Sequence, residues 1–134
     1  MLLDTHAAYW IANGEPIDPE AADFLQKAND EGWPVSVSPI TAWEIGMLVA
    51  RKRISLAISP FDWFNRLLDL GGVTLAPMSP SILISSSFLP GDPPRDPADR
   101  IIAATAREGD YRLITRDRAL LDYAQIGHLR ALRC

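Results

Sequence analysis

Five of the eleven prolines in this chain directly follow a serine or aspartate at the start of a helix-like segment. Serine and aspartate are favoured helix N-caps, and proline at the first helical position loses no hydrogen bond. Each pair therefore predicts where a helix begins and where the preceding element has ended. The pairs are Asp18-Pro19, Ser38-Pro39, Ser59-Pro60, Ser79-Pro80 and Asp96-Pro97.

Short apolar runs alternate with the predicted helices. The runs predict strands at residues 1–3, 35–37, 73–75 and 111–115, with an edge strand at 128–132. The predicted helices cover about residues 5–12, 19–31, 39–51, 60–70, 80–89, 97–108 and 118–123. This alternation predicts an α/β fold, a three-layer α/β/α sandwich with a central parallel sheet. The strands are short and apolar, as burial on both faces requires.

The composition is that of one folded domain, which we expect to span residues 1–134. Hydrophobic residues make up 48% of the chain and charged residues only 22%, which argues against disorder. The single cysteine, Cys134, permits no disulfide within the chain. Because we find neither a signal-peptide pattern nor a membrane-spanning run, we expect a cytoplasmic protein.

The net charge of −4 is unusual for a non-specific nucleic-acid binder, which is generally basic. The charges are, however, unevenly distributed. Residues 95–134 contain eight arginines against six acidic residues. Arginine is the better residue for forked contacts to phosphate, although a mixed solvated surface explains the same composition. The charge alone therefore does not decide which partner the chain binds.

Four acidic residues stand at or near the predicted strand ends. Asp4 follows the first strand, and Asp117 comes just after the fourth. Asp99 lies in the first turn of the helix that precedes the fourth strand, and Glu44 lies in the helix after the second strand. Ligands of open parallel sheets bind at the carboxyl ends of the strands, where the strand order reverses. We therefore expect these four carboxylates to converge.

Crowded carboxylates repel one another unless a cation lies among them. Hard oxygen ligands favour Mg²⁺ or Mn²⁺, and one or two such ions support hydrolysis of a phosphodiester bond. Each acid also has a purely local explanation. Asp4 and Asp117 suit helix or turn starts, Asp99 suits a first helical turn, and Glu44 ends a capping-box pattern that begins at Thr41. The conjunction of all four favours one site.

Several further residues accompany the acids. Asp96 is expected to cap its helix and to serve as an accessory residue of the site, and the hydroxyls of Thr5 and Thr115 are candidates for orienting the carboxylates. Arginines beside an anionic pocket suit a phosphodiester whose charge the metal only partly neutralises. Their alternative role is intramolecular pairing with the same acids. These candidate RNA-binding residues are Arg95, Arg100, Arg116 and Arg118.

In order and spacing, these stretches resemble the PIN-domain ribonucleases, and in particular the VapC-type toxins of bacterial toxin–antitoxin pairs. The matching stretches are Leu2-Leu3-Asp4-Thr5-His6 with Trp10, Ser38 to Ile45, Arg95 to Ala106, and Leu113-Ile114-Thr115-Arg116-Asp117. The resemblance implies the strand order 3-2-1-4-5, dependence on Mg²⁺ or Mn²⁺, and cleavage of single-stranded RNA or of a structured RNA such as tRNA. It also implies a homodimer and a cognate antitoxin. Carried over by position, the family's acidic set falls on Asp4, Glu44, Asp99 and Asp117.

The chain departs from the family pattern at four positions. Relatives often carry a histidine just before the Asp-Pro-x-Asp-Arg pattern and an aromatic residue within it, where this chain has Pro93, Pro94 and Ala98. A lysine often found soon after the glutamate is here Leu48. These departures motivate a rival hypothesis, a catalytically inactive PIN-fold module that binds protein. A phospho-receiver is disfavoured because no aspartate follows the third strand.

Overall fold

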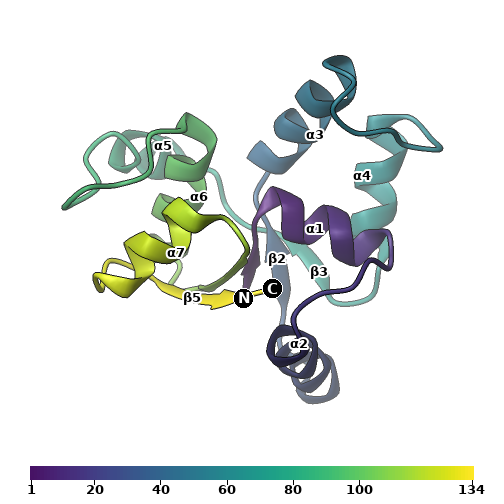
Figure 1. Ribbon diagram of the computed structural model, residues 1–134, viewed down its shortest axis with the longest axis horizontal. Helices are drawn as coiled ribbons and strands as arrows, with labels where there is room; N and C mark the ends of the chain where they lie inside the picture. The colour runs from purple at the N-terminus through teal and green to yellow at the C-terminus, as the bar shows by residue number, and fades with distance from the viewer.

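The computed structural model describes residues 1–134 and contains a five-stranded sheet in the order β3-β2-β1-β4-β5 (Figure 1). Every neighbouring pair of strands is parallel. The strand order and the parallel sheet are the ones expected from the sequence. The strands are β1 (Leu2–Leu3), β2 (Val35–Val37), β3 (Val73–Leu75), β4 (Arg112–Thr115) and β5 (Arg130–Arg133).

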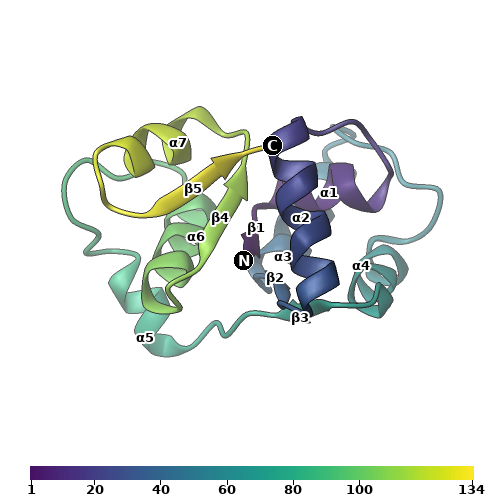
Figure 2. The same cartoon turned by 90° about the horizontal axis from the view of Figure 1, so that it is seen from below.

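The helices cover both faces of the sheet, which confirms the three-layer sandwich. They are α1 (Thr5–Ala12), α2 (Pro19–Glu31), α3 (Ile40–Ala50), α4 (Pro60–Asp69), α5 (Pro80–Ser85), α6 (Pro97–Glu108) and α7 (Arg118–Gln125). Figure 2 shows α5, α6 and α7 on one side of the sheet and α1, α2 and α4 on the other. Helix α3 contacts α1, α4 and α6. No helix is long and apolar enough to cross a membrane.

Adjacent residues of the central strands point into opposite halves of the core. Leu2 of β1 and Leu113 of β4 belong to the cluster beneath α5, α6 and α7. Their chain neighbours Leu3 and Ile114 belong to the cluster beneath α1, α2 and α4. Side chains alternate between the faces of a strand, so an all-apolar strand fills both layers. This double burial fixes the register that places the acidic residues at one edge.

The predicted helix starts are confirmed to within one residue. Ser59, Ser79 and Asp96 accept hydrogen bonds from the first turns of α4, α5 and α6. Helix α3 begins one residue later than predicted, at Ile40, whose N–H donates to the Ser38 hydroxyl over 3.3 Å. Asp18 precedes α2 without a side-chain cap.

Two predicted ends are wrong. Helix α5 ends at Ser85 and not near Leu89, because a run of serines interrupts it. The hydroxyls of Ser85 and Ser86 donate to the carbonyls of Ile82 and Leu83, and such local bonds compete with helix continuation. Strand β5 is shifted toward the C-terminus by one or two residues from the predicted 128–132, since its pairing with β4 runs from Arg112 to Thr115.

Candidate active site

Asp4 occupies the end of β1 and is almost completely buried, with 3% of its surface exposed. The N–H of Ala7 donates to its Oδ1 over 2.5 Å, so Asp4 caps α1. The Thr115 hydroxyl donates to its Oδ2. Both carboxylate oxygens therefore have a fixed hydrogen-bond partner, and the carboxylate cannot rotate freely at the strand end.

Glu44 reaches the same region from α3. The hydroxyl of Thr5, the first residue of α1, donates to Glu44 Oε2. The same hydroxyl lies 3.1 Å from the hydroxyl of buried Thr41, one turn earlier on α3. Glu44 lies inside α3 and not at its start, so the capping-box alternative does not describe it.

Asp96 and Asp99 stand at the start of α6. Asp96 caps the helix by accepting hydrogen bonds from the N–H groups of Ala98, over 2.8 Å, and Asp99, over 3.2 Å. The carboxylate of Asp99 has no hydrogen-bond partner within the chain and is partly buried. It is therefore the member of the set whose oxygens are free to meet a ligand.

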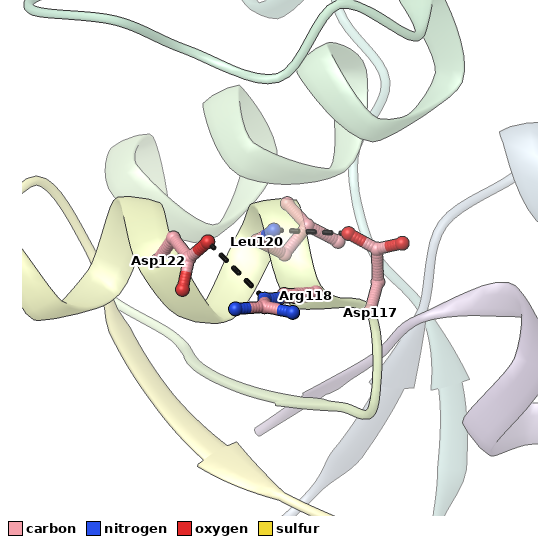
Figure 3. A network of polar contacts seen from close by, with 4 residues as sticks. All are labelled: Asp117, Arg118, Leu120 and Asp122. Carbon is pink, nitrogen blue, oxygen red and sulfur yellow. Dashed lines mark hydrogen bonds and ion pairs between the residues drawn. The ribbon is translucent and has the colours of Figure 1, made fainter.

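Asp117 stands at the start of α7, immediately after β4. Its Oδ1 accepts from the N–H of Leu120 over 3.0 Å, and its own N–H donates to the Thr115 hydroxyl over 3.0 Å. Figure 3 shows this cap and the side chain of Arg118, which turns along α7 toward Asp122. Arg118 Nε lies 3.9 Å from Asp122 Oδ2. No arginine forms an ion pair with Asp117.

The acids act on one another electrostatically. Burial is the largest cause that raises the pKa of Asp99, and together with the charges of Asp117, Asp96, Glu44 and Asp4 it brings that pKa to about 7. Burial also raises the pKa of Asp4, against the hydrogen bonds from Thr115 and Ala7 that lower it. Burial likewise raises the pKa of Glu44, whereas the hydrogen bond from Thr5 lowers it. Of the four carboxylates predicted from the sequence, the other three therefore lie near enough to Asp99 for their charges to raise its pKa.

Residues 1–126 match the family model described as PIN domain. The chain belongs to the PIN domain family. It is 36% identical over 121 residues to Ribonuclease VapC22 of Mycobacterium tuberculosis, a match that covers 90% of this chain and 88% of that protein. The arrangement of the sheet described above is thus that of a PIN domain.

Solved structures share the PIN fold over nearly the whole chain. A toxin–antitoxin complex from Klebsiella pneumoniae is 26% identical, with a TM-score of 0.61, over 98% of this chain and 94% of that one. VapBC2 from Rickettsia felis, solved with a promoter DNA fragment, has a TM-score of 0.66 at 13% identity, over 98% and 96% of the two chains. At that identity the likeness shows the fold alone.

The candidate RNA-binding arginines of this PIN domain divide into two groups. Arg95 and Arg118 are exposed beside the acids. Arg100 donates to the carbonyls of Ser86, Ser87 and Pro94. Arg116 donates to the carbonyls of Cys134 and Pro16 and lies 4.2 Å from the centre of the Trp10 ring. The second pair is engaged within the chain, although with backbone carbonyls and not with the acids.

The structure draws attention to two features that the sequence analysis did not assign to the site. The first is Thr41, whose hydroxyl lies beside that of Thr5. The second is the exposed basic run Arg51-Lys52-Arg53 at the end of α3, which forms no ion pair. Arg51 follows Glu44 by seven residues, which places it on the same helix face about 10 Å further along. The seven-residue spacing from Glu44 is the sequence feature from which this basic run could have been assigned to the site.

The donor set suits a hard divalent cation. All the candidate ligands are carboxylate oxygens, with threonine hydroxyls beside them, and such oxygens select Mg²⁺ or Mn²⁺. No three acidic, histidine or cysteine side chains lie close enough to ligate one ion together. Mg²⁺ usually retains several waters and is held through one or two carboxylates. The residues therefore fit a hydrated ion, and its charge would relieve the repulsion at Asp99.

Proposed function

We propose that this chain is a metal-dependent endoribonuclease that acts as the toxin of a toxin–antitoxin pair. The curated relative that is 36% identical is named a ribonuclease, and it matches 90% of the chain. The Klebsiella pneumoniae structure is described as a toxin–antitoxin complex. Both comparisons support the proposal, and the acidic site described above provides the chemistry.

The observation that carries the proposal is the electrostatic state of Asp99. A solvent-facing aspartate in a first helical turn is normally ionised and stabilised by the helix dipole. Here burial and four neighbouring carboxylates raise its pKa to about 7. Such repulsion costs stability in a purely structural role, whereas a divalent cation bound among the acids relieves it.

Asp4, Glu44, Asp99 and Asp117 would hold Mg²⁺ or Mn²⁺ as ligands, directly or through water. When bound, the ion supplies a Lewis acid that activates water and stabilises the charge that develops on the phosphate. The chain's own contribution is to orient the carboxylates. Thr115 fixes Asp4 and the turn to Asp117, and Thr5 fixes Glu44. Arg95 and Arg118 are placed to attract the phosphodiester backbone at the rim.

The comparisons support an antitoxin partner, and the family resemblance implies the substrate and the assembly proposed with it. We propose that a cognate antitoxin protein binds this chain and that the substrate is single-stranded RNA or a structured RNA such as tRNA. We also propose that the chain forms a homodimer. These assignments of partner, substrate and assembly are checked by co-purification, cleavage mapping and the mass of the protein in solution.

The test is RNA cleavage by the purified full chain with Mg²⁺ or Mn²⁺. We expect cleavage with either ion, none in excess EDTA, and recovery when the ion is restored. The double variant Asp4→Asn with Asp99→Asn should lose activity, because two charges of the shared site are removed while the Asp4 cap is retained. Asp23→Asn, an exposed change on α2, is the matched control. Activity that survives in the double variant contradicts the proposal.

The second candidate is the catalytically inactive binding module. The departures at Pro93, Pro94, Ala98 and Leu48 favour it, because they fall beside Asp96 and Asp99 and one turn beyond Glu44. It predicts binding of the antitoxin without metal-dependent cleavage and without growth arrest on expression. Growth arrest that disappears in the Asp4→Asn, Asp99→Asn variant excludes it.

A further inference from the structure

A cavity of about 500 Å³ opens directly beside the acidic site. It lies between the segment that leads into α6 and one face of α7, and Asp96 and Asp99 form part of its wall. The remaining wall includes Arg95, Asp122, Tyr123 and Ile126. None of the last three belongs to the acidic site or to its predicted arginines. If the phosphate of a ligand lies beside Asp99, the part of the ligand attached to that phosphate can therefore enter this cavity.

The walls of the cavity are fixed before any ligand arrives. The Tyr123 hydroxyl donates to the carbonyl of Pro90 over 2.7 Å, and the Tyr123 ring lies 4.9 Å from the His128 ring. Gly91 has a positive φ of 70°, and a Cβ at this position would collide with His128. Arg100 donates to the carbonyl of Pro94 over 3.4 Å. Contacts at Pro90, Gly91 and Pro94 therefore hold the loop that leads into α6 in place. Binding pockets are usually largely preformed in this way.

The chemistry of the walls selects for hydrogen-bond donors. Asp92 and Asp122 line the cavity in addition to Asp96 and Asp99, and Arg95 is the only basic residue there. An ionised carboxylate accepts hydrogen bonds and donates none, so a second phosphate is disfavoured inside the cavity. Ile126, which is 59% exposed, provides an apolar face at the rim. A flat group with N–H donors on its edge fits both features, and a nucleobase is such a group.

On the α7 side of the cavity, Asp122 is the one carboxylate available to such an edge. It belongs to no helix cap, and its one ionic partner is Arg118, at 3.9 Å on the exposed side of α7 (Figure 3). A contact of that length between two exposed side chains adds little stability and is easily replaced. Asp96, by contrast, already accepts two backbone hydrogen bonds.

We propose that this cavity receives the nucleobase next to the scissile phosphate and that Asp122 makes the site selective for guanine. Guanine presents two adjacent donors on its Watson–Crick edge, which match the two oxygens of one carboxylate. Cytosine and adenine present one amino group there, and uracil presents one N–H between two carbonyls. Unstacked bases of single-stranded RNA are commonly recognised through this edge. The inference rests on the proposed ribonuclease function.

The first experiment maps cleavage of a random RNA library by the full chain with Mg²⁺. We expect guanine to be enriched at one fixed position within one nucleotide of the cleaved bond. In Asp122→Asn the enrichment should fall by about tenfold, the size typical of one bidentate base contact. Asp23→Asn on α2 should leave it unchanged. Absence of guanine enrichment in the wild type, or its persistence in Asp122→Asn, overturns the inference.

A second experiment does not depend on cleavage and so separates this inference from the proposed function. Guanosine monophosphate is titrated into the protein and the backbone amide signals are followed by NMR. We expect shifts at Tyr123 and Ile126 that are weaker with uridine monophosphate and weaker in Asp122→Asn. Equal shifts with both nucleotides, or none at these residues, overturn the guanine site even if the protein cleaves RNA.

Discussion

At the scale of single residues, Thr115 joins two parts of the site. Its hydroxyl donates to Asp4 and accepts from the N–H of Asp117, so one buried oxygen connects the ends of β1 and β4. Partners that orient metal-binding carboxylates are often as important as the ligands themselves. The role of Thr115 is therefore to fix the relative positions of two acids.

Replacing Thr115 with valine should impair both stability and activity. The change keeps the volume but leaves the Asp117 N–H without an acceptor, which costs about 1–3 kcal/mol of the free energy of unfolding. RNA cleavage should fall by about 10- to 100-fold, the usual cost of losing such a partner. Urea unfolding and cleavage rates measure the two effects. Thr115→Ser, which restores the hydroxyl, should recover both, and wild-type cleavage by the valine variant would refute this role.

The raised pKa of Asp99 makes stability depend on pH. Its pKa moves from 3.8 to about 7 in the folded chain. Between these values folded Asp99 holds a proton that the unfolded chain has released, so rising pH favours unfolding. The stability that this group contributes is complete below about pH 4 and is lost as the pH passes through 7. Asp117, Asp96, Glu44 and Asp4 are the charges that face it.

Asp99→Asn should therefore gain stability relative to the wild type as the pH rises. We expect the difference in the free energy of unfolding to be small near pH 4 and to grow up to about pH 7, because the amide does not titrate. Urea unfolding in EDTA at pH 4.5, 6 and 7.5 measures it. A difference that stays constant over this range would show that Asp99 is not held protonated by its neighbours.

The residues of the candidate site could be predicted from the sequence because motif and topology agree. Asp4 and Asp117 follow strands that are neighbours in the sheet, and the parallel order follows from the alternation of elements. The hydrogen bonds of Arg100 and Arg116 to backbone carbonyls could not be predicted. Their carbonyl acceptors come from Ser86, Pro16 and Cys134, which local pattern does not relate to them.

At the scale of the elements, helix starts proved more predictable than helix ends. A cap such as Asp96 with a following proline specifies the first turn locally. The end of α5 depends on which carbonyls accept hydrogen bonds from the serine hydroxyls. The shift of β5 depends on its pairing with β4. The position of β5 is therefore set by tertiary pairing that a short sequence window does not show. The end of α5 is set by local hydroxyl bonds, whose acceptors the sequence pattern does not specify.

Helix α6 offers a direct test of how much its cap contributes. Asp96→Ala removes two hydrogen bonds to the first turn and should lower the free energy of unfolding by about 1 kcal/mol. Asp96→Ser should restore most of that loss, because serine caps equally well. If the serine variant regains stability but not cleavage, Asp96 has an accessory role in the site. If serine is no more stable than alanine, the cap is not what stabilises α6.

At the scale of the whole molecule, the sheet divides the core into two clusters and brings distant acids to one edge. We propose that residues 1–134 form a single domain, since both clusters include residues of β1 and β4. The net charge of −4 means that attraction to RNA must come from local groups. Exposed groups of this kind include Arg95 and Arg118, beside the acids, and the run Arg51-Lys52-Arg53 after α3.

The basic run at the end of α3 should contribute to RNA affinity through phosphate contacts. Changing Arg51, Lys52 and Arg53 to alanine should reduce the salt dependence of binding, with the slope of log K against log salt falling by about 2. Binding of a single-stranded RNA to the non-cleaving Asp4→Asn, Asp99→Asn protein measures it. Lys27→Ala, on α2, is the control. An unchanged slope would place the RNA elsewhere.

The central claim is that Asp4, Glu44, Asp99 and Asp117 share a divalent cation, and titration of the protein with Mn²⁺, followed by electron paramagnetic resonance, tests it most directly. We predict saturable binding that Mg²⁺ displaces, with affinity about 10- to 100-fold weaker in Asp99→Asn and in Asp117→Asn. Asp23→Asn should bind like the wild type. Mn²⁺ affinity that is the same in all of these proteins would contradict the account.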